Sequence, residues 1–208
     1  VEDNITTIDV LVTYASILEK KGEYNEVLSL QKDIYERRNR ILGENHPKTL
    51  EATVALAKAY DKMGRYSDAL PLRELVLEKR RTLFGELHPK TLKAIWGVAY
   101  NLEQLGRYQE ALKLRLEIYE KYRQTQGDDF PDTIVALGNV AGCYKNLGEF
   151  EKSLSIIKEV CEKIQAKFGY EHPKASSARL SLATLYEKMG RFDDAIALQK
   201  ERLEIRRR

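Results

Sequence analysis

The chain has 208 residues, enough for one large domain or two small ones with a substantial buried core. Hydrophobic residues make up 43% and charged residues 32% of it, which argues against a disordered chain, and no apolar run is long enough to span a membrane. Because 35 Lys and Arg residues are balanced by 32 Asp and Glu residues of interspersed sign, a nucleic-acid-binding surface is disfavoured, apart from the terminal Arg206-Arg207-Arg208.

From the N-terminus onward, glycines recur at an interval of 42 residues. One set is Gly22, Gly64, Gly106, Gly148 and Gly190, and a second is Gly43, Gly85, Gly127 and Gly169. Prolines keep the same interval at positions 47, 89, 131 and 173. Five copies without a gap indicate an internal repeat, and we place its boundaries at 4–45, 46–87, 88–129, 130–171 and 172–208.

Each repeat is predicted to contain two helices. In the second repeat the first helix covers about 48–63, a turn follows at Gly64-Arg65-Tyr66, and the second helix covers about 67–83. Gly64 and Gly85 supply the backbone freedom that ends the two helices, and Pro47 suits a first helical turn. Pro71 falls in the first turn of its helix, where no intrahelical N–H partner is lost. Five such pairs make ten helices.

Small residues also recur where two helices approach closely. The first helices carry Ala15, Ala57, Ala99, Ala141 and Ala183, and the second helices carry Val27, Ala69, Ala111, Ser153 and Ala195. A single helix pair cannot bury its apolar stripe, so neighbouring repeats must stack and share one core. The sequence therefore predicts a single all-α domain over residues 1–208, an α-solenoid stabilised mainly between neighbours.

The motif Leu56-Ala57-x-x-Tyr60-x-x-x-Gly64-Arg65-Tyr66-x-x-Ala69 resembles the tetratricopeptide repeat. The 42-residue form with Gly-x-x-His-Pro between repeats is similar to the repeats of kinesin light chain and of some NTPase-type receptors. The resemblance implies a right-handed superhelix whose first helices line a concave, peptide-holding surface. Kinesin light chain repeats commonly carry paired asparagines there, and only Asn139 matches them, so that family's cargo preference is not carried over.

The middle of this surface carries an unusual combination. Trp96 and Tyr100 share one helix face, whereas Gly138 and Gly142 leave bare backbone on the next first helix. Each glycine costs about 1 kcal/mol of helix stability relative to alanine. We interpret this as a slot for an extended or helical segment with acidic residues. In the alternative interpretation, Trp96 packs between repeats and the glycines make room for it. The predicted peptide-binding residues are Lys58, Lys62, Trp96, Tyr100, Gly138, Asn139, Gly142, Lys145 and Asn146, the lysines meeting acidic side chains and the asparagines the peptide backbone.

Other chemistry is disfavoured. His46, His88 and His172 occupy one position of successive repeats, too far apart to share a metal, so each is interpreted as a residue that starts a helix. Cys143 and Cys161 have no neighbouring base and are interpreted as buried thiols of a cytoplasmic chain. No phosphate loop or nucleophile elbow occurs. We expect no enzyme activity, no metal and no cofactor.

Basic residues of the second helices alternate with glutamates, the pattern of a solvated face. They include Arg73, Lys79, Arg80, Arg115 and Arg123.

The leading hypothesis is a protein- or peptide-binding scaffold that binds neither nucleic acid nor membranes. The alternative is the sensor or self-associating region of a larger regulatory protein, which works by end-to-end stacking. A designed repeat protein is disfavoured, because the surface residues vary irregularly between copies while the packing residues do not.

Overall fold

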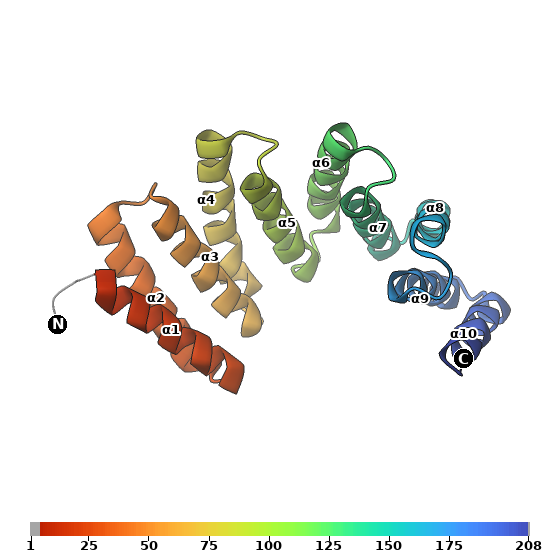
Figure 1. Cartoon of the computed structure of the whole chain (residues 1–208), viewed down its shortest axis with the longest axis horizontal. Helices are drawn as coiled ribbons and strands as arrows, with labels where there is room; N and C mark the ends of the chain where they lie inside the picture. The colour runs from red at the N-terminus through yellow and green to blue at the C-terminus, as the bar shows by residue number, and fades with distance from the viewer. Residues whose placement is uncertain (1–4, 208) are drawn as a thin grey trace. The chain divides into compact units, whose positions relative to one another are not determined.

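The computed structural model describes the backbone of residues 5–207 and the side chains of residues 6–204. Within that range the chain forms ten α-helices and no strand (Figure 1). They are α1 (Ile5–Lys21), α2 (Tyr24–Leu42), α3 (Pro47–Lys62), α4 (Tyr66–Phe84), α5 (Pro89–Gln104), α6 (Tyr108–Gln126), α7 (Pro131–Asn146), α8 (Phe150–Phe168), α9 (Pro173–Lys188) and α10 (Phe192–Arg207). The all-α helical-repeat prediction is confirmed, with the predicted helix ends of the second repeat correct to within one residue.

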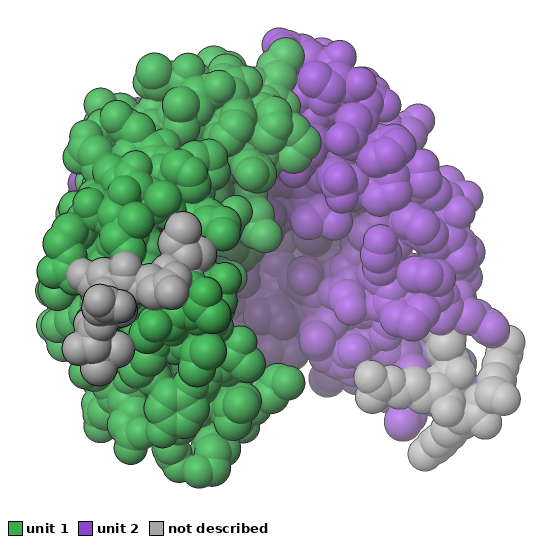
Figure 2. All heavy atoms as spheres, turned by 60° about the vertical axis from the view of Figure 1, so that its left-hand side comes forward, with its two compact units in different colours: residues 1–106 green, residues 107–208 purple. Residues whose placement is uncertain are grey.

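The helices fall into two compact units, residues 1–106 with α1–α5 and residues 107–208 with α6–α10 (Figure 2). Within each unit every helix packs against the next one in the chain. The prediction of one domain with five repeat boundaries stays a prediction. Its outermost residues, Asn4 and Arg208, lie outside the described residues, as do the side chains of Arg206 and Arg207.

Two glycines of each complete repeat end its helices. Gly64 follows α3 with φ +70°, and Gly85 follows α4 with φ +80°, both in the left-handed region that disfavours any side chain. The equivalent glycines of the other repeats share this conformation. The 42-residue glycine interval therefore records where the chain must turn.

The recurring small residues lie where the helices approach most closely. Ala57 of α3 and Ala69 of α4 are fully buried, as are their equivalents Ala99 and Ala111. A larger side chain at these positions would push the helix axes apart. The predicted close-packing positions are thus confirmed.

Three arginines of the second helices do not lie on a solvated face, so the prediction was wrong for them. Arg80 is 8% exposed and Arg115 is 3% exposed, and the Arg73 side chain is 12% exposed. The Arg73 guanidinium pairs with Asp61, and that of Arg80 donates a hydrogen bond to the carbonyl oxygen of Lys90. Lys79 and Arg123 do form ion pairs at the surface, with Glu44 and Glu120.

The recurring histidines cap helices. Nδ1 of His46, His88 and His172 accepts a hydrogen bond of 3.1 Å from the backbone N–H two residues later. The His88 ring also stacks on Phe84, with ring centroids 4.6 Å apart. The interpretation of these residues as helix-starting residues is confirmed, whereas Phe130 at the equivalent position makes no side-chain cap.

Among the described residues, no helix combines the length and apolar content that a membrane crossing requires. The cytoplasmic location stays a prediction.

We predict that His88→Ala destabilises the chain by about 1 kcal/mol, because the first turn of α5 loses its cap. His88→Asn should retain most of that stability, since asparagine caps well but cannot replace the stacked ring. Chemical denaturation followed by circular dichroism measures both. Equal losses in the two variants would show that the ring contact with Phe84, rather than the cap, stabilises this helix start.

Candidate functional site

Two pockets occupy the same place in different repeats. Each lies between the first helices of two successive repeats and has the intervening second helix as its floor. In unit 1 the pocket lies between α3 and α5 over α4, with a volume of about 410 Å³. In unit 2 it lies between α7 and α9 over α8, with a volume of about 500 Å³.

The unit 1 pocket, called the basic pocket below, is rich in cations. Lys58, Arg73, Arg80, Lys90 and Lys93 line it against a single carboxylate. The complete lining is Glu51, Val54, Ala55, Lys58, Arg73, Val76, Arg80, Lys90, Lys93, Ala94 and Trp96. Cations thus strongly outnumber anions in this lining, whereas the two are nearly balanced over the chain as a whole.

Arg73 is neutralised from within the fold. Its guanidinium forms an ion pair with Asp61, whose other oxygen accepts a 2.6 Å hydrogen bond from Asn101. Gly97 of α5 permits this approach, because a Cβ atom there would lie only 2.4 Å from Nη1 of Arg73. The three polar side chains join α3, α4 and α5 beneath the pocket, so the role of Arg73 is in part structural.

Arg80 has no such counterion. Its Nη1 donates a 3.0 Å hydrogen bond to the carbonyl oxygen of Lys90, and within residues 6–204 it forms no ion pair. Burial lowers the pKa of the Arg80 guanidinium, and the nearby Glu51 opposes that shift only in part. Arg38, at the equivalent position one repeat earlier, makes the same carbonyl bond but also lies 3.7 Å from a carboxylate oxygen of Asp9.

An aromatic pair lies beside the basic pocket. The Trp96 and Tyr100 rings are nearly parallel, at 3°, with centroids 5.8 Å apart. Tyr100 also meets Tyr66 edge-on at 6.2 Å, and burial followed by the hydrogen bond with Tyr66 raises the pKa of the Tyr100 hydroxyl. Trp96 remains 46% exposed, which leaves a large aromatic surface open next to the cations.

The unit 2 pocket, called the apolar pocket, has the opposite chemistry at equivalent positions. Where α4 presents Arg73, Val76 and Arg80, α8 presents Ile157, Val160 and Ile164 two repeats later. The remaining lining residues are Ile134, Val135, Gly138, Asn139, Ala141, Gly142 and Lys145 of α7, Ser153 of α8, and Pro173, Lys174, Ser177, Ala178, Ser181 and Leu185 of α9. This pocket suits an apolar side chain.

The two glycines of α7 open the apolar pocket. A Cβ atom on Gly142 would meet no heavy atom within 4 Å, and one on Gly138 would meet only Val160, at 3.9 Å. Neither glycine is therefore needed for packing within its own unit. Their effect is to leave the pocket wider and the helix backbone bare.

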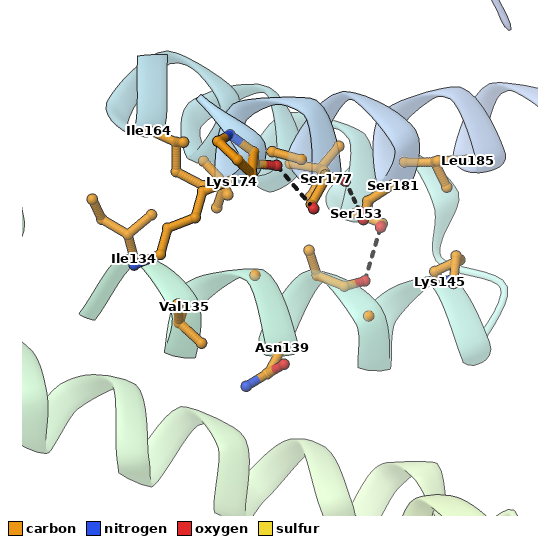
Figure 3. A pocket seen from close by; sticks show the side chains of 17 residues that line it. Ile134, Val135, Asn139, Lys145, Ser153, Ile164, Lys174, Ser177, Ser181 and Leu185 are labelled. Atoms are coloured by element: carbon orange, nitrogen blue, oxygen red, sulfur yellow. Dashed lines mark hydrogen bonds between the residues drawn. The ribbon is translucent and has the colours of Figure 1, made fainter. Parts of the chain in front are cut away.

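The polar groups around the apolar pocket are mostly engaged (Figure 3). Ser153 donates to the carbonyl oxygen of Ala141 at 2.8 Å, and Ser177 and Ser181 bond carbonyls of their own helix. Asn139 lies on α7 with its side chain directed away from α9, whereas Lys145 lies near the C-terminal end of α7 (Figure 3). The two lysines, Lys145 and Lys174, are the basic groups of the lining.

The predicted binding residues divide between the two pockets. Lys58 and Trp96 line the basic pocket, and Gly138, Asn139, Gly142 and Lys145 line the apolar pocket. Lys62, Tyr100 and Asn146 line neither of them. Sequence reasoning followed the first helices alone and missed the floors, although aligning the second helices at 42-residue intervals would have exposed the change from arginine to isoleucine.

The cysteines offer little reactivity. Cys143 is 1% exposed. Burial raises the pKa of the Cys161 thiol to about 11, so the nucleophilic thiolate is scarce at neutral pH.

Comparison with known proteins agrees with this architecture. A profile of the tetratricopeptide repeat matches residues 6–82, 90–162 and 132–208. A search of curated protein sequences found no match to the chain.

Among solved structures, a kinesin-light-chain-like protein from Podosopora anserina with nearly identical TPR-like repeats is 22% identical, with a TM-score of 0.85 and coverage of 99% of this chain and 97% of that chain. BtubC (BKLC) from P. vanneervenii is 19% identical, with a TM-score of 0.77 and coverage of 96% and 79%. A Rap protein complexed with competence and sporulation factor is 17% identical, with a TM-score of 0.67 and coverage of 92% and 51%.

These structures share the fold at low identity, and the family profile covers nearly the whole chain. The chain belongs to the tetratricopeptide repeat family and is similar to the kinesin light chain repeats.

Proposed function

We propose that the chain is a protein- or peptide-binding module that holds a partner segment against its first helices. The observation that carries the proposal is the pair of equivalent pockets with opposite chemistry, one basic with an open tryptophan and one apolar with bare glycine backbone. Packing alone does not account for either feature, since Trp96 is half exposed and Gly142 has free space around it. A scaffold without enzyme activity is the corresponding role.

The partner segment has matching chemistry in this proposal. An apolar side chain enters the apolar pocket, where burial of a Leu-sized group contributes about 1.5–3 kcal/mol. An acidic group meets Lys58 and its neighbours in the basic pocket, beside the face of Trp96. The similar Rap protein has been solved as a complex with competence and sporulation factor, which supports a bound factor as the kind of ligand that this fold accepts.

We predict that Gly142→Leu weakens partner binding at least tenfold while it raises stability by up to about 1 kcal/mol. The new side chain has room on α7 and improves helix propensity, but it fills the space that the partner needs. Affinity is measured by calorimetry with a peptide selected by display on the intact chain. Trp96→Ala should lose binding at unchanged helicity, and Lys113→Ala, which removes an exposed lysine of α6 outside both pockets, is the matched control. Unchanged affinity in both pocket variants would contradict the proposal.

A second candidate role, end-to-end self-association, has its own observation. Val10 and Ile17 of α1 are 64% and 51% exposed, although Ala52 and Ala59, one repeat later, are buried. On α10, Ile196 is 51% exposed, whereas its equivalents Leu28, Leu70, Leu112 and Leu154 are all buried. Both end faces thus carry apolar residues at positions that are buried elsewhere in the repeat. A second copy could cover α10 with its own α1, an arrangement that extends head to tail.

We predict that the molar mass rises with concentration in multi-angle light scattering, and that Ile196→Asp or Val10→Asp restores a monomer, because each places a charge in the apolar end face. Leu116→Asp, at an exposed leucine of α6, is the control and should associate like the wild type. A wild-type chain that stays monomeric up to about 0.5 mM, a range that covers even weak association, would contradict this role.

A further inference from the structure

The basic pocket carries more positive charge than its own residues neutralise. Asp61 compensates Arg73, but within residues 6–204 Lys58, Arg80 and Lys93 form no ion pair. Lys90 lies over the ring of Phe84 at 5.3 Å, a contact that Lys174 repeats over Phe168 and that is therefore structural. Three cations and the single carboxylate of Glu51 remain to meet a ligand.

Arg80 is the cation of this pocket that an anionic ligand would stabilise most. It is 8% exposed, its guanidinium donates to the carbonyl oxygen of Lys90, and Glu51, at the position equivalent to Asp9, acts on it electrostatically without forming an ion pair, so its charge is only partly compensated. A buried charge without a counterion is costly, and an anion in the pocket would remove that cost. The Arg80 guanidinium is thus buried on the pocket floor and forms no ion pair with the described residues.

The start of α5 adds to the positive potential. Lys90 and Lys93 lie in its first turns, and its first turn contains no acidic residue. The positive end of the helix dipole therefore lies on the same side as these lysines, an arrangement that normally favours an anion there. The N-terminus of α5 and its two lysine side chains thus both favour a negatively charged ligand.

We propose that the basic pocket binds the phosphate group of a phosphorylated serine or threonine in the partner segment, with Arg80 and Lys93 as its cationic ligands. The inference rests on the function proposed above and names the chemistry of one of its two anchors. A phosphate monoester carries a charge of about −1.5 to −2 at neutral pH and three acceptor oxygens. It matches three unpaired cations better than a carboxylate, which carries one charge and two oxygens.

A peptide fits this pocket better than a nucleic acid. Outside the pocket the charges of the chain are interspersed and nearly balanced, so a polyphosphate backbone would find no continuous cationic path. One phosphate beside the open ring of Trp96 needs a single cationic pocket of this size. Glu51 is the one group that would repel it, so its removal should strengthen binding.

Trp96 provides a direct readout, because it is the only tryptophan of the chain and lines the pocket. Three capped pentapeptides, with alanines around a central serine, phosphoserine or glutamate, are titrated into the intact chain while Trp96 fluorescence is recorded. We expect a saturable change with the phosphoserine peptide, at an affinity at least about tenfold higher than with the glutamate peptide. No response to phosphoserine, or equal affinities for phosphoserine and glutamate, would overturn the inference.

Matched variants test the assigned ligands. Lys93→Gln should weaken phosphoserine binding about tenfold, and Glu51→Gln should strengthen it, whereas Lys113→Gln, on α6 outside both pockets, should leave it unchanged. All three side chains are exposed, so the variants should fold like the wild type. Arg80→Gln should abolish binding, with thermal denaturation as its check on folding. Equal affinity of wild type and Lys93→Gln would refute the assignment.

The outcome is separable from that of the proposed function. A selected partner whose binding depends on Gly142 but not on phosphate or Lys93 would keep the binding module and refute the phosphate site. If neither Gly142→Leu nor Lys93→Gln changes partner binding, both the binding module and the phosphate site are refuted.

Discussion

The structure depends on one constraint: a single helix pair of this chain cannot bury its own apolar stripe, so it must pack against its neighbours. Each first helix therefore packs between two second helices of its unit wherever both are present, through fully buried alanines such as Ala57 and Ala183. The turns at Gly64 and Gly85 return the chain to make these contacts, and histidine caps start the first helices. Stability is thereby spread over neighbour contacts, so the faces that remain open can vary without loss of the fold.

The pockets follow from the same packing. Two successive first helices are held apart by the second helix between them, and the space that remains takes its chemistry from that helix. Arg73 and Arg80 make one such floor polar and cationic, whereas Ile157 and Ile164 make another apolar. The same helix arrangement thus supports two different surfaces, and the residues of the second helix that distinguish them also take part in the packing of their unit.

The sequence was sufficient for most of the fold, because glycine, proline and alanine recur at fixed positions for steric reasons that any copy must satisfy. It also predicted six residues that line the pockets, since Trp96, Gly142 and their neighbours depart visibly from the repeat. It failed for Arg80 and Arg115, which alternate with glutamates like surface residues but lie buried. The burial of a long cationic side chain depends on which neighbour accepts its hydrogen bonds, and that partner, such as the carbonyl oxygen of Lys90, leaves no mark in the local pattern.

The central claim is that a partner contacts the first helices and the floors between them. Methyl-resolved NMR of isoleucine-labelled chain, titrated with a peptide selected by display, tests it most directly. The account predicts shifts of the Ile157 and Ile164 methyl groups and of the Trp96 indole, while Ile41, exposed at the C-terminal end of α2, stays unchanged. Shifts at Ile41 with none at the two pocket isoleucines would place the partner elsewhere and contradict the account.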